Sequence, residues 1–116
     1  MAETKPHTIF MLLKATPAWL AMAPPERFGF VNATLRPLIA RYPAVRMRYF
    51  DAEAYCARVS DIAVWESADL RAYRNLVEEL RETPFWDVYF QVVEIIPAVE
   101  DDYADFYSQP AVAKSA

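Results

Sequence analysis

The sequence predicts an α+β protein with the ferredoxin-like order β-α-β-β-α-β, in which two helices cover one face of a four-stranded antiparallel sheet. Short apolar runs typical of strands alternate with two longer segments in which apolar residues recur every three to four positions. The chain has 116 residues, 55% of them hydrophobic and only one of them Gly, which excludes a disordered or repetitive chain. We expect a single domain over residues 1–116, with a core at about 8–98 and a tail at 99–116.

The first half of the chain is predicted to form a strand, a short turn and a long helix. The apolar run Thr8–Lys14 predicts the first strand. A Thr-Pro pair after it predicts a helical turn over Ala18–Met22, with the Thr as N-cap. Apolar residues at helical spacing then predict a helix over Pro24–Tyr42, which Pro37 should bend.

The second half is predicted to form a strand, a hairpin partner for it, a helix and a last strand. These four elements are expected at Val45–Asp51, Tyr55–Glu66, Ala68–Glu82 and Val88–Ile96. In the first of them apolar and basic residues alternate with the period of two that places neighbours on opposite faces of a sheet. Ser67 is the expected N-cap of the helix, and Pro97 is expected to end the last strand.

One face of this sheet is left without helices. The apolar side chains expected there are Phe10, Leu12, Phe50, Phe90 and Val92. So much apolar surface is rarely left in water, so we expect a homodimer formed through this open face. The acidic and aromatic segment Glu100–Tyr107 would then lie along a partner subunit or stay solvated, and both interpretations remain open.

Composition excludes several classes of function. One Cys (Cys56) and one His (His7) exclude the common Cys and His metal sites, so we expect no metal and no cofactor. A net charge of −4 argues against nucleic acid as a partner. No apolar run approaches the ~20 residues that span a bilayer, so we expect a cytoplasmic protein. The single Gly cannot build a phosphate-binding loop.

Charged and aromatic side chains are predicted to meet on the open face. Arg46 and Arg48 share a face of the second strand with Lys14 nearby, and Glu94 has the same parity on the last strand as Phe90. A few polar groups over apolar bulk are typical of binding sites. The candidate ligand-binding residues of this face are Lys14, Arg46, Arg48, Phe50 and Phe90, and Glu94 is a candidate catalytic residue. A plain salt bridge between Arg46 and Glu94 is the alternative interpretation.

A second polar group gathers around the expected hairpin. Its members are Asp51, Tyr55, Arg58, Asp61 and Trp65. A carboxylate beside an Arg stays ionised and can act as a base or bind an ammonium group, while Tyr and Arg can stabilise a developing oxyanion. Asp51 and Asp61 are therefore candidate catalytic residues, and the other three are candidate substrate contacts. Surface ion pairs that only hold the hairpin together are the alternative.

Three long stretches carry a family resemblance: TPAWLAMAPPERFGF, RPLIARYPAVRMRYFDAEAYCARVSDIAVWE and LVEELRETPFWDVYFQVVEIIPAVEDDYADFY. Through them the chain resembles the darcynin family from about Thr8 to Tyr107, nearly its whole length. This resemblance implies a small bacterial protein, but it implies no activity and no set of catalytic positions.

In size and element order the chain also resembles the lysinoalanine synthases of cinnamycin- and duramycin-type lantibiotic pathways. That resemblance implies a dimeric, cofactor-free enzyme of lanthipeptide biosynthesis, which joins a lysine amine of a bound peptide to dehydroalanine. The three candidate carboxylates would then bind the lysine ammonium, and Arg46, Arg48 or Arg58 would orient carbonyl groups. The alternative is a darcynin-family dimer that binds a small hydrophobic ligand, or a cofactor-free monooxygenase-like module, since one fold hosts many functions.

Overall fold

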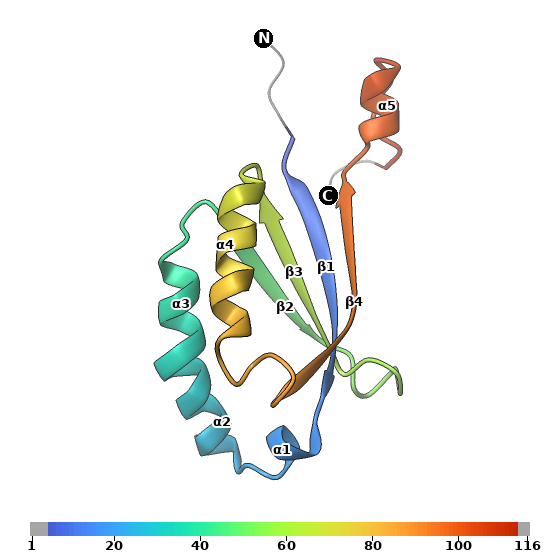
Figure 1. The fold of residues 1–116 in the computed structure, drawn as a ribbon. Helices are drawn as coiled ribbons and strands as arrows, with labels where there is room; N and C mark the ends of the chain where they lie inside the picture. Colours follow the sequence, from blue (N-terminus) through green and yellow to red (C-terminus); the bar gives the residue numbers. More distant parts are fainter. Residues whose placement is uncertain (1–4, 114–116) are drawn as a thin grey trace.

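Four antiparallel strands form one sheet in the order β2-β3-β1-β4. The computed structural model describes residues 5–113, so the ends of the expected domain and tail, 1–4 and 114–116, lie outside the described residues. The strands are β1 (His7–Ala15), β2 (Arg46–Asp51), β3 (Asp61–Ser67) and β4 (Phe90–Val99). This arrangement confirms the predicted α+β fold with its ferredoxin-like sheet (Figure 1).

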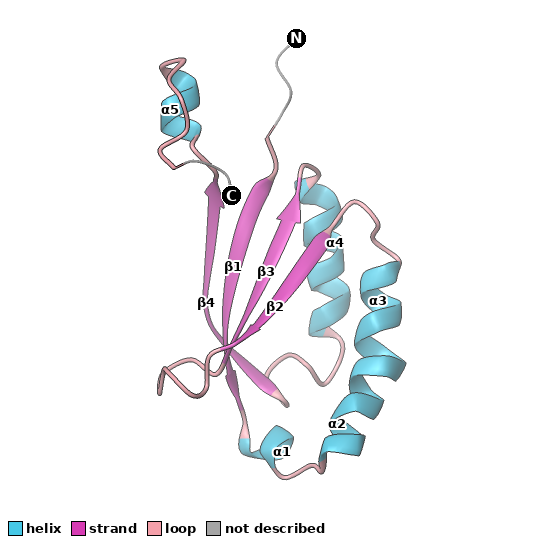
Figure 2. Ribbon diagram, turned by 180° about the vertical axis from the view of Figure 1, so that it is seen from behind, coloured by secondary structure: helices cyan, strands magenta, loops and turns pink. Residues whose placement is uncertain are grey.

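Helices cover one face of the sheet. The helical segments are α1 (Pro17–Leu20), α2 (Pro24–Phe30), the π-helical turn η1 (Val31–Leu35), α3 (Arg36–Ala40), α4 (Leu70–Arg81) and α5 (Asp102–Phe106). Figure 2 shows α2, α3 and α4 on the same side of the sheet, whereas α5 lies beyond the end of β4. Within residues 5–113, no helix is long and apolar enough to cross a membrane.

The core lies between the helices and the covered face of the sheet. Ile9, Met11 and Leu13 alternate along β1 and are buried, and Leu76 and Leu80 face them from α4. The two spacings, two residues on the strand and four on the helix, are those that place side chains on one face of each element. Burial of each such side chain contributes roughly 1.5–3 kcal/mol to stability.

The predicted turn after the first strand is confirmed as α1. Thr16 is its N-cap and accepts a hydrogen bond from the backbone N–H of Trp19 at 3.4 Å. The Trp19 ring then packs against Phe90, with 4.9 Å between ring centroids, and against Tyr89 at 5.4 Å. This short helix therefore closes one end of the helix-covered side of the sheet.

The predicted long helix is one helical segment with an irregular middle. Pro37 lies in the first turn of α3, directly after the π-helical turn Val31–Leu35. A Pro has no N–H to donate to the carbonyl four residues earlier, which is a recognised cause of helix irregularity. The prediction was a bend at Pro37, and what the structure has is an irregular turn on the N-terminal side of that residue.

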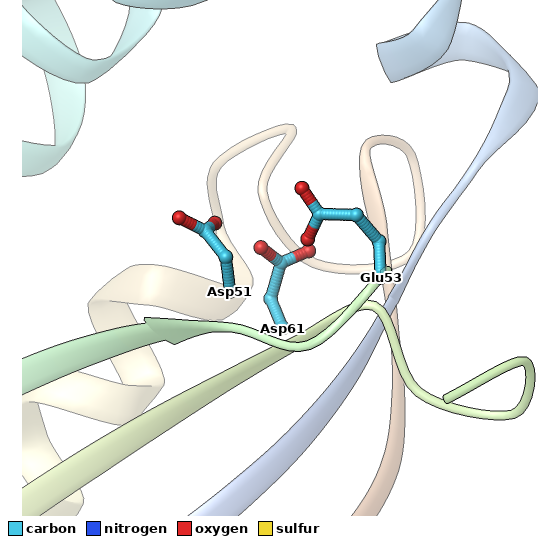
Figure 3. Close-up of side chains that lie close together, drawn as sticks. All are labelled: Asp51, Glu53 and Asp61. Atoms are coloured by element: carbon cyan, nitrogen blue, oxygen red, sulfur yellow. The ribbon is translucent and has the colours of Figure 1, made fainter. Parts of the chain in front are cut away.

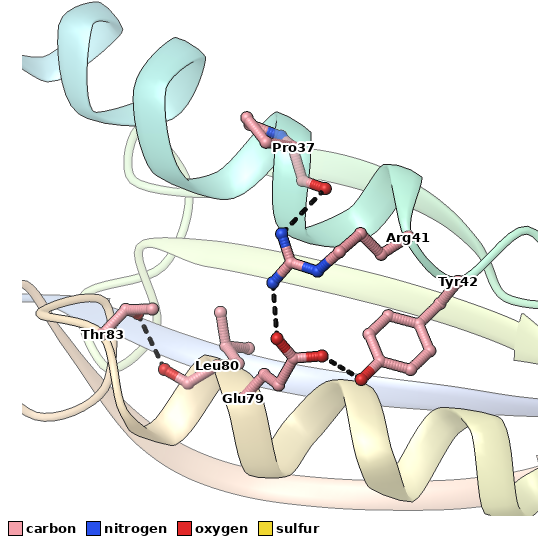
Figure 4. A network of polar contacts seen from close by, with 6 residues as sticks. All are labelled: Pro37, Arg41, Tyr42, Glu79, Leu80 and Thr83. Atoms are coloured by element: carbon pink, nitrogen blue, oxygen red, sulfur yellow. Dashed lines mark hydrogen bonds and ion pairs between the residues drawn. The ribbon is translucent and has the colours of Figure 1, made fainter.

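A polar network ties the end of this segment to α4 (Figure 4). Arg41 donates to Glu79 at 2.5 Å, and the Tyr42 hydroxyl donates to the other oxygen of the same carboxylate. These hydrogen bonds lower the pKa of Glu79, the one from Tyr42 most, because they favour its ionised form. The network fixes how far α3 stands from α4, and with it the position of one wall of the site described below.

The third strand begins later than predicted. Residues Tyr55–Ser60 belong to the loop between β2 and β3, and β3 begins at Asp61. The loop closes on itself: the N–H of Ala52 donates to the carbonyl of Ser60 at 2.8 Å, and that of Cys56 donates to Ala52 at 3.0 Å. Local backbone hydrogen bonds of the loop thus take the place of the strand pairing that the sequence pattern of Tyr55–Ser60 predicted.

Two predicted element ends are also corrected. Asp69, not Ser67, is the N-cap of α4, because its carboxylate accepts from the N–H of Ala72 at 3.0 Å. Ser67 ends β3, and its hydroxyl donates to the carbonyl of Ala44 at 2.9 Å. Pro97 does not end β4, which continues to Val99; a Pro is tolerated there because β4 is an edge strand.

A β-bulge in β4 reverses the predicted orientation of one aromatic and one aliphatic side chain, those of Phe90 and Val92. Leu12 pairs with Glu94 while its neighbour Leu13 pairs with Val92, so the register skips one residue of β4. An extra residue on one strand inverts the alternation beyond it. Phe90 and Val92 therefore face the helices, and the prediction that they lie on the open face is wrong. Phe90 is only 3% exposed.

Candidate functional site

The helix-covered side of the sheet contains a cavity of about 860 Å³, within the usual size range of small-molecule sites. Its apolar walls come from α1, η1, α3 and the inner sides of the strands. The main apolar lining residues are Trp19, Leu35, Ile39, Met47, Ala63 and Phe90. The π-helical turn contributes Leu35 directly, so the irregularity near Pro37 helps to shape this wall.

Three carboxylates close one end of the cavity. Asp51 ends β2, Asp61 begins β3 directly opposite it, and Glu53 follows in the loop. One carboxylate oxygen from each lies within 4.8 Å of the other two. Figure 3 shows the three side chains projecting from neighbouring strand ends to the same side of the sheet. The hairpin register therefore assembles an acidic end in a mostly apolar cavity.

Asp61 is the buried member of this acidic end. The Ser60 hydroxyl donates to its Oδ2 at 2.7 Å, and the Ser60 oxygen accepts from the N–H of Ala15 at 2.7 Å. The pKa of Asp61 is raised to about 6, chiefly by burial and with smaller contributions from the neighbouring Asp51 and Glu53 carboxylates, against the opposing effect of the Ser60 hydrogen bond. Asp61 therefore changes its charge in the range where a proton acceptor is useful near neutral pH.

Two aromatic side chains that carry hydrogen-bond donors, Tyr49 and Trp65, line the same cavity. Burial raises the pKa of Tyr49, and the charges of Asp61 and Asp51 raise it too, so this phenol stays protonated. Among the described residues, Trp65 Nε1 is the buried side-chain donor without a hydrogen-bond partner. A buried polar group without a partner is costly, so this donor is a feature that a ligand could satisfy.

Two arginines line the helical wall, and both are engaged in local hydrogen bonds. Arg27 donates to the carbonyls of Trp19 and Leu20 at 3.1 and 3.0 Å, which links α2 to α1. Arg36 donates to Asn32 one turn earlier at 2.8 Å. Their bonds hold the helical layer together, and the acidic end remains on the opposite, strand side of the cavity.

The acidic end has the donor chemistry of a hard cation site. Carboxylate oxygens are the ligands that Ca²⁺ and Mg²⁺ prefer, although both ions need six or more ligands in total. The expectation that the protein binds no metal rested on its Cys and His counts, which do not address a site built from carboxylates alone. The same three groups can equally bind an ammonium group or move a proton.

The outer-face candidates do not converge within one chain. Phe50 and Lys14 lie on the uncovered face, as predicted, together with Arg46, Arg48 and Glu94. However, β2 and β4 are opposite edges of the sheet with two strands between them. The predicted meeting of arginines and Glu94 is therefore wrong for a single copy. The Arg46 guanidinium instead lies 3.9 Å from Glu66 on β3.

The remaining outer-face contacts are local. Arg48 lies over the Phe50 ring, 5.1 Å from its centroid. Lys14 donates to the carbonyl of Ala57 at 2.5 Å and so links β1 to the loop between β2 and β3. The first contact lies within β2, and the second ties the hairpin loop to the outer face of β1.

The candidates around the hairpin divide between the loop and the cavity. Tyr55 is 92% exposed in the loop, and Arg58 is exposed beside it, so neither belongs to the acidic end. Asp51, Asp61 and Trp65 all line the cavity. The structure thus brings together the two predicted aspartates, while the two loop residues lie apart from them.

Sequence reasoning missed three polar residues at the acidic end of the cavity: Tyr49, Glu53 and Ser60. Tyr49 could have been found, because it alternates with Asp51 on one strand and so shares its face. Glu53 lies two residues beyond a strand end, where loop geometry decides its direction. The sequence signal for the acidic end was one aspartate at the end of β2 and another at the start of β3, where the hairpin loop joins the two strands.

Solved structures with a similar fold include chlorite dismutases. The chlorite dismutase of Candidatus Nitrospira defluvii, in complex with imidazole, has a TM-score of 0.73 at 16% identity and covers 94% of this chain but 47% of its own. A dimeric chlorite dismutase from Nitrobacter winogradskyi has a TM-score of 0.63 at 19% identity, covering 84% of this chain and 58% of its own. The chain spans about half the length of these proteins, and at such identities the likeness shows the fold alone.

Sequence comparison identifies the family. The model of Darcynin, a domain of unknown function, matches residues 2–116. A darcynin homologue of Streptomyces avermitilis is 48% identical over 113 residues, covering 96% of this chain and 93% of the homologue. One from Granulibacter bethesdensis is 44% identical over 106 residues, covering 90% and 86%. The predicted resemblance to darcynin is thereby confirmed, and the chain belongs to the darcynin family.

Proposed function

We propose that this protein binds a small organic amine in the cavity between its helices and its sheet. The observation that carries the proposal is the cavity itself, which is apolar over most of its lining and ends in three clustered carboxylates. An apolar pocket with a few convergent polar groups is the usual form of a small-molecule site. The proposal follows the ligand-binding alternative that the sequence suggested, with an amine in place of the small hydrophobic ligand expected there.

The acidic end and the apolar walls of the cavity together indicate the class of ligand. An ammonium group donates up to three hydrogen bonds and would offset the mutual repulsion of Asp51, Glu53 and Asp61. The apolar walls would take an aliphatic or aromatic body attached to that ammonium. A carboxylate group would meet three like charges at the acidic end, so we expect anions to be rejected from that end of the cavity.

The finer hypothesis is catalysis on such an amine. In lysinoalanine formation the lysine ammonium loses a proton, its nitrogen bonds to the β-carbon of dehydroalanine as the C=C bond opens, and the α-carbon takes up a proton. Asp61, whose pKa of about 6 lies near neutrality, has the chemistry of a proton acceptor for that step. This lysinoalanine synthase hypothesis rests on the acidic end of the cavity and on the resemblance described above.

Ligand binding can be measured by isothermal titration calorimetry with 2-phenylethylamine and its neutral analogue 2-phenylethanol. We expect the amine to bind at least tenfold more tightly at pH 7.5, since a charge-assisted hydrogen bond contributes about 1.5–3 kcal/mol. We expect the preference to shrink at pH 5, where Asp61 is protonated. Asp61→Asn should reduce it at pH 7.5 as well.

Glu78→Gln is the matched control, because this acidic residue is exposed on α4 and lies outside the cavity. It should leave the preference for the amine unchanged. Equal affinity for the amine and the alcohol, or an Asp61→Asn variant that keeps the full preference, would overturn the proposal. Thiol labelling of dehydroalanine in a lysine-containing peptide tests the finer hypothesis, because crosslink formation removes the labelled site.

A further inference from the structure

The outer face of the sheet has apolar side chains that no element of the described chain covers. Phe10, Phe50 and Ile96 are 37–42% exposed there and come from three different strands. A groove of about 600 Å³ crosses this face near the Arg46 end of β2. Aromatic and aliphatic surface of this kind marks an interaction site in most proteins.

The two edges of that face carry opposite charge. β2 presents Arg46 and Arg48 outward, and the Arg46 side chain is 84% exposed. From β4 onward, residues 90–113 contain five acidic residues and no Lys or Arg. Glu94 lies on the outer face of β4, and the other four acidic residues lie at 100–105, in and before α5. The face is therefore basic at one edge and acidic at the other.

The helix α5 projects from the acidic edge with its aromatic residues exposed. Tyr103 and Phe106 are 78% and 80% exposed, although their rings are large and apolar. Lys5 holds the segment in place by an ion pair to Asp105 at 2.5 Å and a hydrogen bond to the carbonyl of Glu100 at 2.8 Å. It is thus a positioned arm that extends beyond the sheet (Figure 1).

The sheet register places this arm and the basic edge at the same end of the molecule. Arg46, Glu66, Thr8 and Ala98 form one row across the four strands. The segment that leads to the arm begins two residues after Ala98, and α5 itself begins at Asp102. A second copy can therefore reach Arg46 with its arm if the two sheets face each other with their rows aligned.

We propose that two copies of this chain pack outer face to outer face around a two-fold axis parallel to the strands, so that β4 and α5 of each copy lie over β2 of the other. Rotation about this axis exchanges the β2 edge and the β4 edge. It leaves corresponding strand ends of the two copies at the same end of the dimer. It sets the acidic edge on the basic edge twice, and the aromatic arm of one copy over the Arg46 end of its partner. The inference gives a geometry to the predicted dimer and does not depend on the amine in the cavity.

Charge decides between this axis and the other face-to-face arrangement. An axis perpendicular to the strands would place β4 on β4, with Glu94 of one copy facing the same residue of the other. It would also place β2 on β2, with two pairs of arginines together. Like charges placed together at an interface disfavour association. Only the axis along the strands pairs the opposite edges of the face.

Crosslinking between single-cysteine variants tests the geometry. In a Cys56→Ser background, Ser108→Cys marks the arm and Ala44→Cys marks the loop before β2; both positions are exposed. Mixed and treated with a short bis-maleimide, these two variants should give a crosslinked heterodimer, while either variant alone should give little. Gln91→Cys, at the far end of β4, should not crosslink to Ser108→Cys.

A crosslink of Ser108→Cys to Gln91→Cys in place of Ala44→Cys would overturn the proposed axis. A wild-type chain that sediments as a monomer at tens of micromolar concentration would overturn the dimer altogether. Neither result bears on amine binding, which is measured separately in the cavity.

Charge reversal gives a second, independent test by analytical ultracentrifugation. Arg46→Glu with Arg48→Glu in one variant, and Glu100→Lys with Asp102→Lys in another, should each weaken self-association at least tenfold. An equimolar mixture of the two should recover part of the lost affinity as a heterodimer. Glu78→Lys on α4 with Glu82→Lys at its C-cap, both exposed, is the control and should change little. Absence of any recovery in the mixture would contradict the edge pairing.

Discussion

Ser60 and Asp61, adjacent in sequence, form a polar pair at the floor of the cavity: the Ser60 hydroxyl donates to Asp61 Oδ2 at 2.7 Å. The same hydroxyl oxygen accepts from the backbone of β1, so the pair is anchored to a central strand of the sheet. This hydrogen bond favours the ionised carboxylate, while burial and two neighbouring carboxylates favour the neutral one. Burial dominates, and the consequence is a pH-dependent charge inside an apolar cavity.

Asp61→Asn should remove a pH dependence of stability. Because the pKa of Asp61 is about 6 in the folded state and lower in the unfolded state, ionisation costs the folded state stability as pH rises from about 4 to 6. We expect the wild type to lose on the order of 1 kcal/mol more than Asp61→Asn over this interval, after allowance for partial solvent screening. Urea unfolding at pH 4, 5, 6 and 7 measures this difference. Parallel pH curves for the two proteins would contradict the assignment.

Glu79→Gln should have the opposite pH signature. Hydrogen bonds from Tyr42 and Arg41 lower the pKa of Glu79 in the folded state, so its contribution is present above the unfolded pKa and is lost as pH falls. The Tm of the variant should therefore lie below that of the wild type at pH 7, and the gap should close toward pH 3. Calorimetry across this range checks it, with Glu78→Gln on the same helix as control. A gap that does not depend on pH would indicate a packing effect instead.

Ala40→Phe should fill the cavity from its helical wall. Ala40 ends α3, lines the cavity and is exposed, so a larger side chain can enter the open space without replacing core atoms. We expect at least a tenfold loss of affinity for the neutral probe N-phenyl-1-naphthylamine, measured by fluorescence, with little change in Tm. Ala33→Phe, which is exposed on η1 and outside the cavity, is the matched control. Equal loss in both variants would place the probe elsewhere.

Local patterns were sufficient to predict the order of the elements. The alternation of Val45–Asp51 and the helical spacing around Leu76 each satisfy a single period, and both elements are present in the structure. The bulge in β4 could not be predicted in this way, because an extra residue in a ladder depends on how its partner strand pairs. That one residue moved Phe90 from the predicted open cleft to the wall of the cavity.

The candidate site was predicted only in part, because local sequence patterns place only some of its residues. Asp51 and Asp61 share an end of the hairpin, which strand alternation and hairpin pairing can suggest. The cavity beside them depends on where α3 stands, and this segment follows the π-helical turn and is tied to α4 by the Tyr42–Glu79 contact across 37 residues. No local period in the sequence contains such a contact.

Cys56 should react with iodoacetamide at a lower pH than an ordinary cysteine. Backbone N–H groups of Val59 and then Arg58 donate to its sulfur and lower the thiol pKa, and the Arg58 charge adds a smaller effect in the same direction. The pH at half-maximal alkylation rate should therefore lie below that of glutathione measured under the same conditions. Arg58→Gln should raise this pH only slightly, because the backbone donors remain, whereas unfolding in urea should remove the whole shift. A variant that shifts as far as the unfolded chain would mean that the Arg58 charge, and not the loop backbone, lowers the thiol pKa.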